Sequence, residues 1–192
     1  MKKNLDSRKV FLIAFWIVIF TSCKNKPNEE KVDVLKNTIE NNLGSKLSIP
    51  KKMRLYQPFN NYVADSMQIA NANLKIYTRI DASCPTCINS INKWLKFANK
   101  LFTDKVPVIL VCASKDNFEL MKYFCENGEI KKFPYPFFLD KENEYLGKNS
   151  FMNVSPQIET VLTDSQDNIL LIGNPIHSED IMKLYLAKVQ SR

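Results

Sequence analysis

Residues 74–87 read LKIYTRIDASCPTC, and this stretch decides the fold. Its first half places apolar residues or threonine at every second position, with Lys, Tyr and Arg between them, which is the period of a β-strand. After the second cysteine, apolar residues return at helical spacing, namely Ile88, Ile91, Leu95, Ala98 and Phe102. The chain order is therefore a strand, the motif Cys-Pro-Thr-Cys and a helix.

The position of the two cysteines predicts redox chemistry. Pro85 suits the first turn of a helix, where its missing N–H would have no partner. Cys84 then lies at the helix N-terminus, where free amide groups and the helix dipole stabilise a thiolate and lower its pKa. Cys87 follows one turn later on the same side and is able to close a disulfide with Cys84. The alternative, half of a zinc site, would need Cys112 and Cys125, which are not spaced as a second CxxC pair.

The N-terminus has the three regions of an export signal over residues 1–22. Basic residues precede an apolar run at 10–20, and small residues follow it. The run is too short to span a bilayer, which takes about 20 apolar residues. Residues 20–23 resemble a bacterial lipobox, although Phe20 replaces the usual aliphatic residue, so we expect Cys23 to be acylated and to become the first mature residue. An uncleaved anchor or ordinary secretion is the alternative.

Composition and charge limit the other functions. The chain has 192 residues, 45% of them hydrophobic and 24% charged, as expected of one globular domain. The net charge is +7, but the predicted signal carries four basic residues and one acidic residue, so the remainder is only mildly basic. Its lysines are scattered along the chain, with no aromatic surface for stacking bases between them, so we do not expect nucleic-acid binding. The single histidine, His177, excludes His-rich zinc sites, and we expect it to be a surface residue without a catalytic role.

The predicted organisation has four parts. Residues 1–22 are the signal, 23–31 a polar tether, 32–73 an N-terminal extension packed on the domain, and 74–192 the main domain. The extension begins with a short amphipathic helix at 32–43, which Gly44 follows as a C-cap. The main domain is expected to continue after the CxxC helix with a buried strand at 106–111, a helix at 116–127, a short strand at 133–140, a hairpin at 157–173 and a last helix from 178.

This order of elements resembles the thioredoxin superfamily, and in particular its membrane-anchored, TlpA-like thiol-disulfide oxidoreductases. The resemblance covers about residues 74–188 and implies an α/β fold, a three-layer sandwich with a central mixed β-sheet flanked by helices. The family's cis-proline matches Pro156 by position, and Ser155 before it would pair with an incoming peptide as an added strand. Ser83 replaces the family's usual tryptophan. We assign no residue to the buried acid of many relatives, because Asp81 is near the motif but is equally suited to end the strand.

The predicted activity is thiol-disulfide exchange, in which Cys84 attacks a partner disulfide and Cys87 resolves the mixed disulfide. No cofactor is expected. The expected partners are exported proteins with thiols or disulfides and a membrane electron donor, and the expected location is the periplasmic side of a bacterial cell envelope. The direction of the reaction stays open.

Two other interpretations of the motif stay open as well. One is a partner-binding or redox-sensing module with little turnover, which the loss of tryptophan at Ser83 favours. The other is a Cu(I) chaperone, although no methionine or histidine lies near the motif to complete a copper site. Cys112 and Cys125 are expected to be small buried hydrophobic residues, and a disulfide between them is left open.

Overall fold

The computed structural model describes residues 26–60 and 62–191. The predicted signal at 1–22 and the predicted lipid site at Cys23 lie outside the described residues. The described residues from 37 onward form one compact unit, and the described part of residues 1–36 is the beginning of helix α2 (Lys26–Asn42). The predicted tether at 23–31 is therefore helical from Lys26 onward. In the part of the chain that is described, no helix has the length and apolar character needed to cross a membrane.

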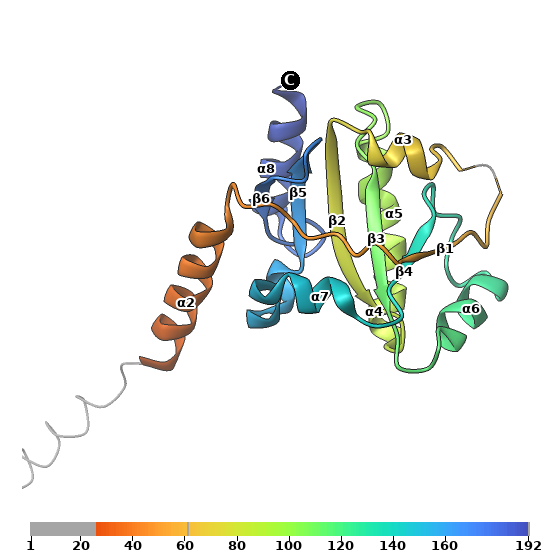
Figure 1. The fold of residues 1–192 in the computed structure, drawn as a ribbon, viewed down its shortest axis with the longest axis horizontal. Helices are drawn as coiled ribbons and strands as arrows, with labels where there is room; N and C mark the ends of the chain where they lie inside the picture. Colours follow the sequence, from red (N-terminus) through yellow and green to blue (C-terminus); the bar gives the residue numbers. More distant parts are fainter. Residues whose placement is uncertain (1–25, 61, 192) are drawn as a thin grey trace, which may run out of the picture. The chain divides into compact units, whose positions relative to one another are not determined.

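A six-stranded sheet in the order β1-β4-β3-β2-β5-β6 forms the centre of the compact unit (Figure 1). Strands β2, β3 and β4 are parallel, whereas β1, β5 and β6 each run antiparallel to their neighbours. The strands are β1 (Arg54–Tyr56), β2 (Leu74–Asp81), β3 (Val108–Ala113), β4 (Phe137–Leu139), β5 (Thr160–Asp164) and β6 (Ile169–Ile172). The predicted α/β class with a central mixed sheet is confirmed.

The register of β2 and β3 places the CxxC motif at the carboxyl ends of the two central strands. Strand β3 is buried at every position, as expected of a Val/Ile/Leu-rich parallel strand in the middle of a sheet. Asp81 at the end of β2 is paired with Ala113 at the end of β3. The loops that follow these two strands therefore start side by side, so the CxxC segment lies next to the β3–α6 turn, which leads into helix α6 (Glu119–Glu126).

Helices flank the sheet, with α5 (Ile91–Lys100) and α7 (Glu144–Lys148) on opposite faces (Figure 1). Phe97 of α5 packs edge to face on Tyr185 of α8, with ring centroids 6.2 Å apart, and both rings are buried. This arrangement confirms the predicted three layers. The remaining helices are α3 (Ser66–Ala70), α4 (Pro85–Asn89), α5 (Ile91–Lys100), α6 (Glu119–Glu126), α7 (Glu144–Lys148) and α8 (Glu179–Gln190), with two 3₁₀ helices, η1 (Ser150–Val154) and η2 (Pro156–Ile158).

Besides α2, which begins at Lys26 and not at residue 32, two helices differ from their predicted extents. The helix after the cysteine motif is divided at Ser90, whose hydroxyl donates to the Cys87 carbonyl oxygen at 2.6 Å; such back-bonding by serine bends helices. Helix α6 begins at Glu119, three residues later than predicted. The reason is that Asn117 and Phe118 adopt left-handed conformations, with φ of 55° and 67°, which a right-handed helix does not accommodate.

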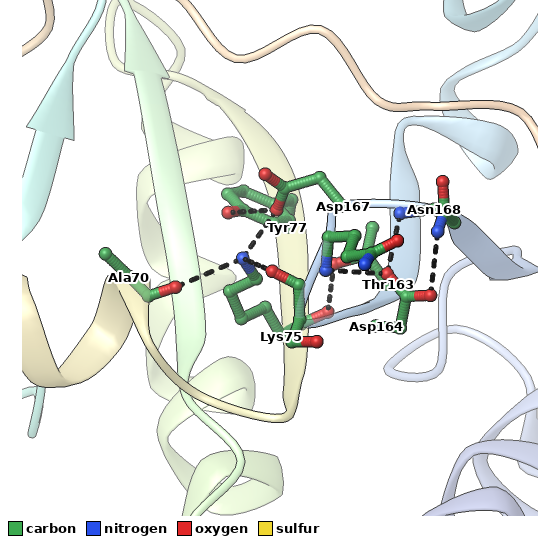
Figure 2. A network of polar contacts seen from close by, with 9 residues as sticks. Ala70, Lys75, Tyr77, Thr163, Asp164, Asp167 and Asn168 are labelled. Atoms are coloured by element: carbon green, nitrogen blue, oxygen red, sulfur yellow. Dashed lines mark hydrogen bonds and ion pairs between the residues drawn. The ribbon is translucent and has the colours of Figure 1, made fainter.

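A buried lysine ties the β5–β6 turn to strand β2. Lys75 of β2 is only 2% exposed, and its Nζ lies 2.6 Å from Asp167 Oδ1 (Figure 2). The same Nζ donates to the carbonyl oxygens of Ala70 and Ser165, both at 3.3 Å. The Tyr77 hydroxyl donates to Asp167 at 3.1 Å. One carboxylate therefore compensates the ammonium group and positions two neighbouring side chains of β2.

Asp167→Ala is expected to lower the free energy of unfolding by roughly 3 kcal/mol, because it leaves the buried Lys75 ammonium without its carboxylate and places alanine at a residue with φ of 65°. Urea denaturation followed by circular dichroism measures the change. The double variant Lys75→Met/Asp167→Asn should recover most of the loss, because no unpaired charge is then buried. A loss below about 0.5 kcal/mol for Asp167→Ala, the size of an ordinary surface substitution, would show that the ion pair contributes little.

Candidate active site

Cys84 is the N-cap residue of helix α4, as the sequence predicts. Its backbone is extended, with φ −113° and ψ 113°, and Pro85 is the first residue of the helix. Its Sγ accepts the Cys87 backbone N–H at 3.3 Å, and the Thr86 Oγ1 lies 3.1 Å away. A hydrogen bond from the Cys87 thiol, then the Thr86 hydroxyl and the Cys87 amide, lower the pKa of Cys84 below its ordinary value. The arrangement stabilises a thiolate on a partly exposed sulfur.

Cys87 has the opposite electrostatic environment. Burial, its hydrogen bond to Cys84 and the negative charge of that sulfur raise the pKa of Cys87 to about 12. The carboxylate of Asp81 raises it further. Of the two thiols, Cys84 is therefore the one that ionises more readily, and Cys87 stays a neutral thiol at neutral pH. This division of roles is what a nucleophile and a resolving thiol require.

Thr86→Val is expected to slow the alkylation of Cys84 at pH 6 by roughly threefold to tenfold, because an exposed hydrogen bond to the thiolate is lost and the pKa of Cys84 rises. Iodoacetamide labelling with mass spectrometry at each cysteine measures the rate. Thr86→Ser keeps the hydroxyl and should retain the wild-type rate. Equal rates for the valine variant and the wild type would mean that the hydroxyl does not stabilise the sulfur.

The structure corrects the expectation of a cis-proline at Pro156. None of the peptide bonds among the described residues is cis. Pro156 is exposed and begins the 3₁₀ helix η2, where the Ser155 Oγ accepts the Gln157 amide at 3.2 Å. This capping interaction turns the chain before the strand begins, so β5 starts only at Thr160. In the described part of the chain, no hydrogen bond joins Ser155 to Cys84 or Cys87, and its role in substrate binding stays a prediction.

Glu159, which sequence reasoning missed, occupies the position directly before β5. Its Oε2 lies 3.5 Å from Arg79 Nη1, and its carbonyl oxygen accepts the Arg79 amide at 3.2 Å. Burial raises the pKa of Glu159, the Arg79 guanidinium opposes this shift, and Asp81 adds to it. The only signal in the sequence is an acidic residue next to a buried strand, which is too common a feature to single it out.

The remaining cysteines lie away from solvent. Cys112 is fully buried and Cys125 is 8% exposed, and all four described cysteines are free thiols. Burial raises the pKa of Cys125 to about 12 and that of Cys112 higher still, so neither is a thiolate at neutral pH. His177 is exposed. No group of three or more metal-binding side chains occurs among residues 26–60 and 62–191.

Comparisons with known proteins agree with this architecture. The family described as Redoxin matches residues 64–162, more than half of the chain, whereas no curated protein matches the sequence. A structure assigned as the thiol:disulfide interchange protein DsbE of Chlorobium tepidum is similar, with 15% identity and a TM-score of 0.51 over 77% of this chain and 97% of that one. A thioredoxin-like protein in its oxidised form is 13% identical, with a TM-score of 0.52 over 76% of this chain and 96% of that one. At these identities the two structures establish the fold alone.

The family match covers the strand, the cysteine motif and its helix, and the matching structures have a thioredoxin-like fold. The chain therefore belongs to the Redoxin family, and its fold is thioredoxin-like.

Proposed function

We propose that this protein is a thiol-disulfide oxidoreductase that acts on the disulfides of exported proteins. The single observation that carries the proposal is that the pKa values of its two thiols are shifted in opposite directions. Hydrogen bonds lower the pKa of Cys84, while burial raises the pKa of Cys87 to about 12. Membership of the Redoxin family supports the same class of chemistry.

The reaction proceeds in two exchanges. The Cys84 thiolate attacks one sulfur of the substrate disulfide, which forms a mixed disulfide and releases the other substrate sulfur as a thiolate. Cys87 then loses its proton and attacks Cys84 Sγ, which releases the second substrate thiolate and leaves a Cys84–Cys87 disulfide. Two electrons pass from the protein to the substrate. A dithiol donor returns them, and the same steps in reverse would oxidise a substrate dithiol.

Loss of charge at Cys84 assists the second exchange. In the mixed disulfide the Cys84 sulfur is neutral, so its contribution to the raised pKa of Cys87 disappears. Burial still opposes ionisation of Cys87, and the Asp81 carboxylate also acts against it. We therefore expect the resolving step to be more strongly pH-dependent than the attack at neutral pH.

The cellular setting of this activity is also a proposal. Residues 1–22 direct export, Cys23 carries the lipid, and the domain acts on the periplasmic side of the envelope, as in TlpA-like proteins. Exported proteins would supply the disulfides, and a membrane electron donor would reduce the Cys84–Cys87 disulfide. The support is the order of basic, apolar and small residues that precede Cys23.

Insulin reduction tests the proposed activity. The purified protein with dithiothreitol should accelerate the precipitation of insulin B chains well beyond dithiothreitol alone. Failure to accelerate it, with the dithiol shown to be reduced and folded, would contradict the proposal.

The second candidate function is a redox-sensing or partner-binding module with little turnover. The observation that favours it is Ser83, which stands where relatives carry tryptophan and is bonded into the neighbouring turn. This candidate predicts that Cys84 and Cys87 form a disulfide reversibly while insulin reduction stays at the background rate.

A further inference from the structure

The residue before the nucleophile is bound to the neighbouring β3–α6 turn. The Ser83 N–H donates to Asp81 Oδ1 at 2.9 Å, which fixes it to the end of its own strand. The Ser83 hydroxyl oxygen accepts the Lys115 amide at 2.6 Å. The same oxygen lies 3.4 Å from both Ser114 Oγ and Asp116 Oδ1. Two segments of the chain therefore hold the backbone that leads into the CxxC motif.

The Asp116 carboxylate accepts hydrogen bonds from the hydroxyls of both Ser83 and Ser114. Ser114 makes a short hydrogen bond to the Asp116 carboxylate, while its own oxygen accepts the amides of Asp116 and Phe118. Although desolvation opposes the shift, the bond from Ser114 and those from backbone amides hold the pKa of Asp116 below its usual range. An ionised carboxylate has no proton to donate. Ser114 therefore donates to Asp116, and the Ser83 hydroxyl directs its proton toward the same group.

The same carboxylate holds the turn in an unusual conformation. It accepts the Phe118 amide at 3.2 Å and the Leu120 amide at 3.1 Å. These bonds act on the turn where Asn117 and Phe118 have positive φ, a region that bulky side chains rarely adopt. The Phe118 side chain is only 5% exposed, so packing fixes the turn as well. Asp116 thus joins a constrained turn to the segment that carries the nucleophile.

We propose that Asp116 is a positioning residue for the dithiol, acting through Ser114 and Ser83 to hold Cys84 in the extended conformation from which its sulfur accepts the Cys87 amide hydrogen. The proposal rests on the proposed function in one respect, because it concerns the same nucleophilic thiol, Cys84. A tryptophan at position 83 would lack the hydroxyl that accepts the Lys115 amide. Ser83 therefore makes a hydrogen bond in this chain that a tryptophan at the same position would not make.

Positioning and direct electrostatics predict opposite signs for a change at Asp116. A negative charge that acted on Cys84 through space would raise its pKa, so Asp116→Asn would make the thiol more acidic. If Asp116 acts by positioning, the neutral amide of Asp116→Asn, a weaker acceptor for Ser114 and the backbone amides, loosens the N-cap geometry and makes the thiol less acidic. The other groups that act on the Cys84 sulfur, namely Asp81 from β2 and Cys87 and Thr86 from α4, are unchanged in this variant.

The test is the pH dependence of Cys84 alkylation in the reduced full chain, with iodoacetamide as the probe and mass spectrometry to identify the modified cysteine. Ser83→Ala and Asp116→Asn should both move the midpoint to higher pH. At pH 6 the rate of Cys84 alkylation should fall about fivefold for Ser83→Ala, which corresponds to the net contribution of one lost hydrogen bond. A faster reaction of Asp116→Asn than of the wild type, or an unchanged midpoint in Ser83→Ala, would overturn the proposal.

Two control variants separate positioning from general stability. Ser178→Ala removes the N-cap oxygen of α8, which accepts the Ile181 amide at 3.4 Å, so it weakens the fold without touching the dithiol. It should leave the Cys84 midpoint unchanged, and a shift equal to that of Ser83→Ala would overturn the proposal. Ser83→Thr keeps the hydroxyl and should restore the wild-type midpoint.

Insulin reduction by the wild type distinguishes the two proposals. An inert wild type whose alkylation midpoint shifts in Ser83→Ala would refute the proposed function and support positioning. An active wild type whose midpoint is unaffected by both substitutions would refute positioning and leave the oxidoreductase activity in place.

Discussion

Cys84→Ser is expected to reduce insulin reduction to the rate of dithiothreitol alone. The serine hydroxyl does not ionise at neutral pH, and no disulfide is able to form through oxygen, so the first exchange is lost. No other described cysteine should substitute, because burial and the Asp81 carboxylate still raise the pKa of Cys87 in this variant, and Cys112 is fully buried. Turbidity at 650 nm measures the rate.

The matched control for this variant is Cys125→Ser, which removes a thiol of the same kind from helix α6. Cys125 is almost buried and lies outside the dithiol, so we expect this variant to retain activity wherever it remains folded. Circular dichroism should confirm folding of both variants. Substantial activity of Cys84→Ser, or equal losses in the two folded variants, would contradict the assignment of Cys84 as the nucleophile.

Cys87→Ser is expected to trap the first intermediate. Cys84 still attacks the substrate disulfide, but without Cys87 the mixed disulfide is not resolved and turnover nearly stops. Non-reducing electrophoresis should show a covalent adduct with insulin chains that dithiothreitol removes. The serine hydroxyl is able to donate the hydrogen bond that the Cys87 thiol gives to Cys84, so we expect the first attack to be retained.

The Cys84→Ser/Cys87→Ser double variant is the control, and it should form no adduct. An adduct in the double variant would place the reactive thiol elsewhere in the chain. Full turnover by Cys87→Ser would show that an external thiol, and not Cys87, resolves the intermediate.

The parts of the fold that could be predicted are those encoded in local periodicity. Strand β2, the cysteine pair and the start of helix α4 follow from the two-residue and helical spacings around residues 74–102. The start of α6 could not be predicted in this way. Its apolar spacing extends back toward Asp116, but the side-chain bonds of Ser114 and Asp116 compete with the helix and hold Phe118 in a left-handed conformation.

The same distinction between local signals and long-range contacts applies to the candidate site. The N-cap position of Cys84 follows from Pro85, which is a local signal. By contrast, Glu159, directly before β5, reaches Arg79 on the neighbouring strand β2, a contact between residues 80 positions apart that no local pattern reveals. Pro156 was placed by its resemblance to a family position, and the isomer of a proline bond depends on the surrounding packing, which periodicity does not report.

Alkylation of the two thiols as a function of pH tests the central claim most directly. The reduced protein is treated with iodoacetamide at a series of pH values, and the labelling of each cysteine is followed by mass spectrometry. Because a thiolate is the reactive form and the pKa of Cys84 is lowered, labelling of Cys84 should rise with pH and level off below the range of a free cysteine, about 8.5, while Cys87 stays unlabelled. A Cys84 midpoint at or above that of free cysteine, or faster labelling of Cys87, would contradict the account.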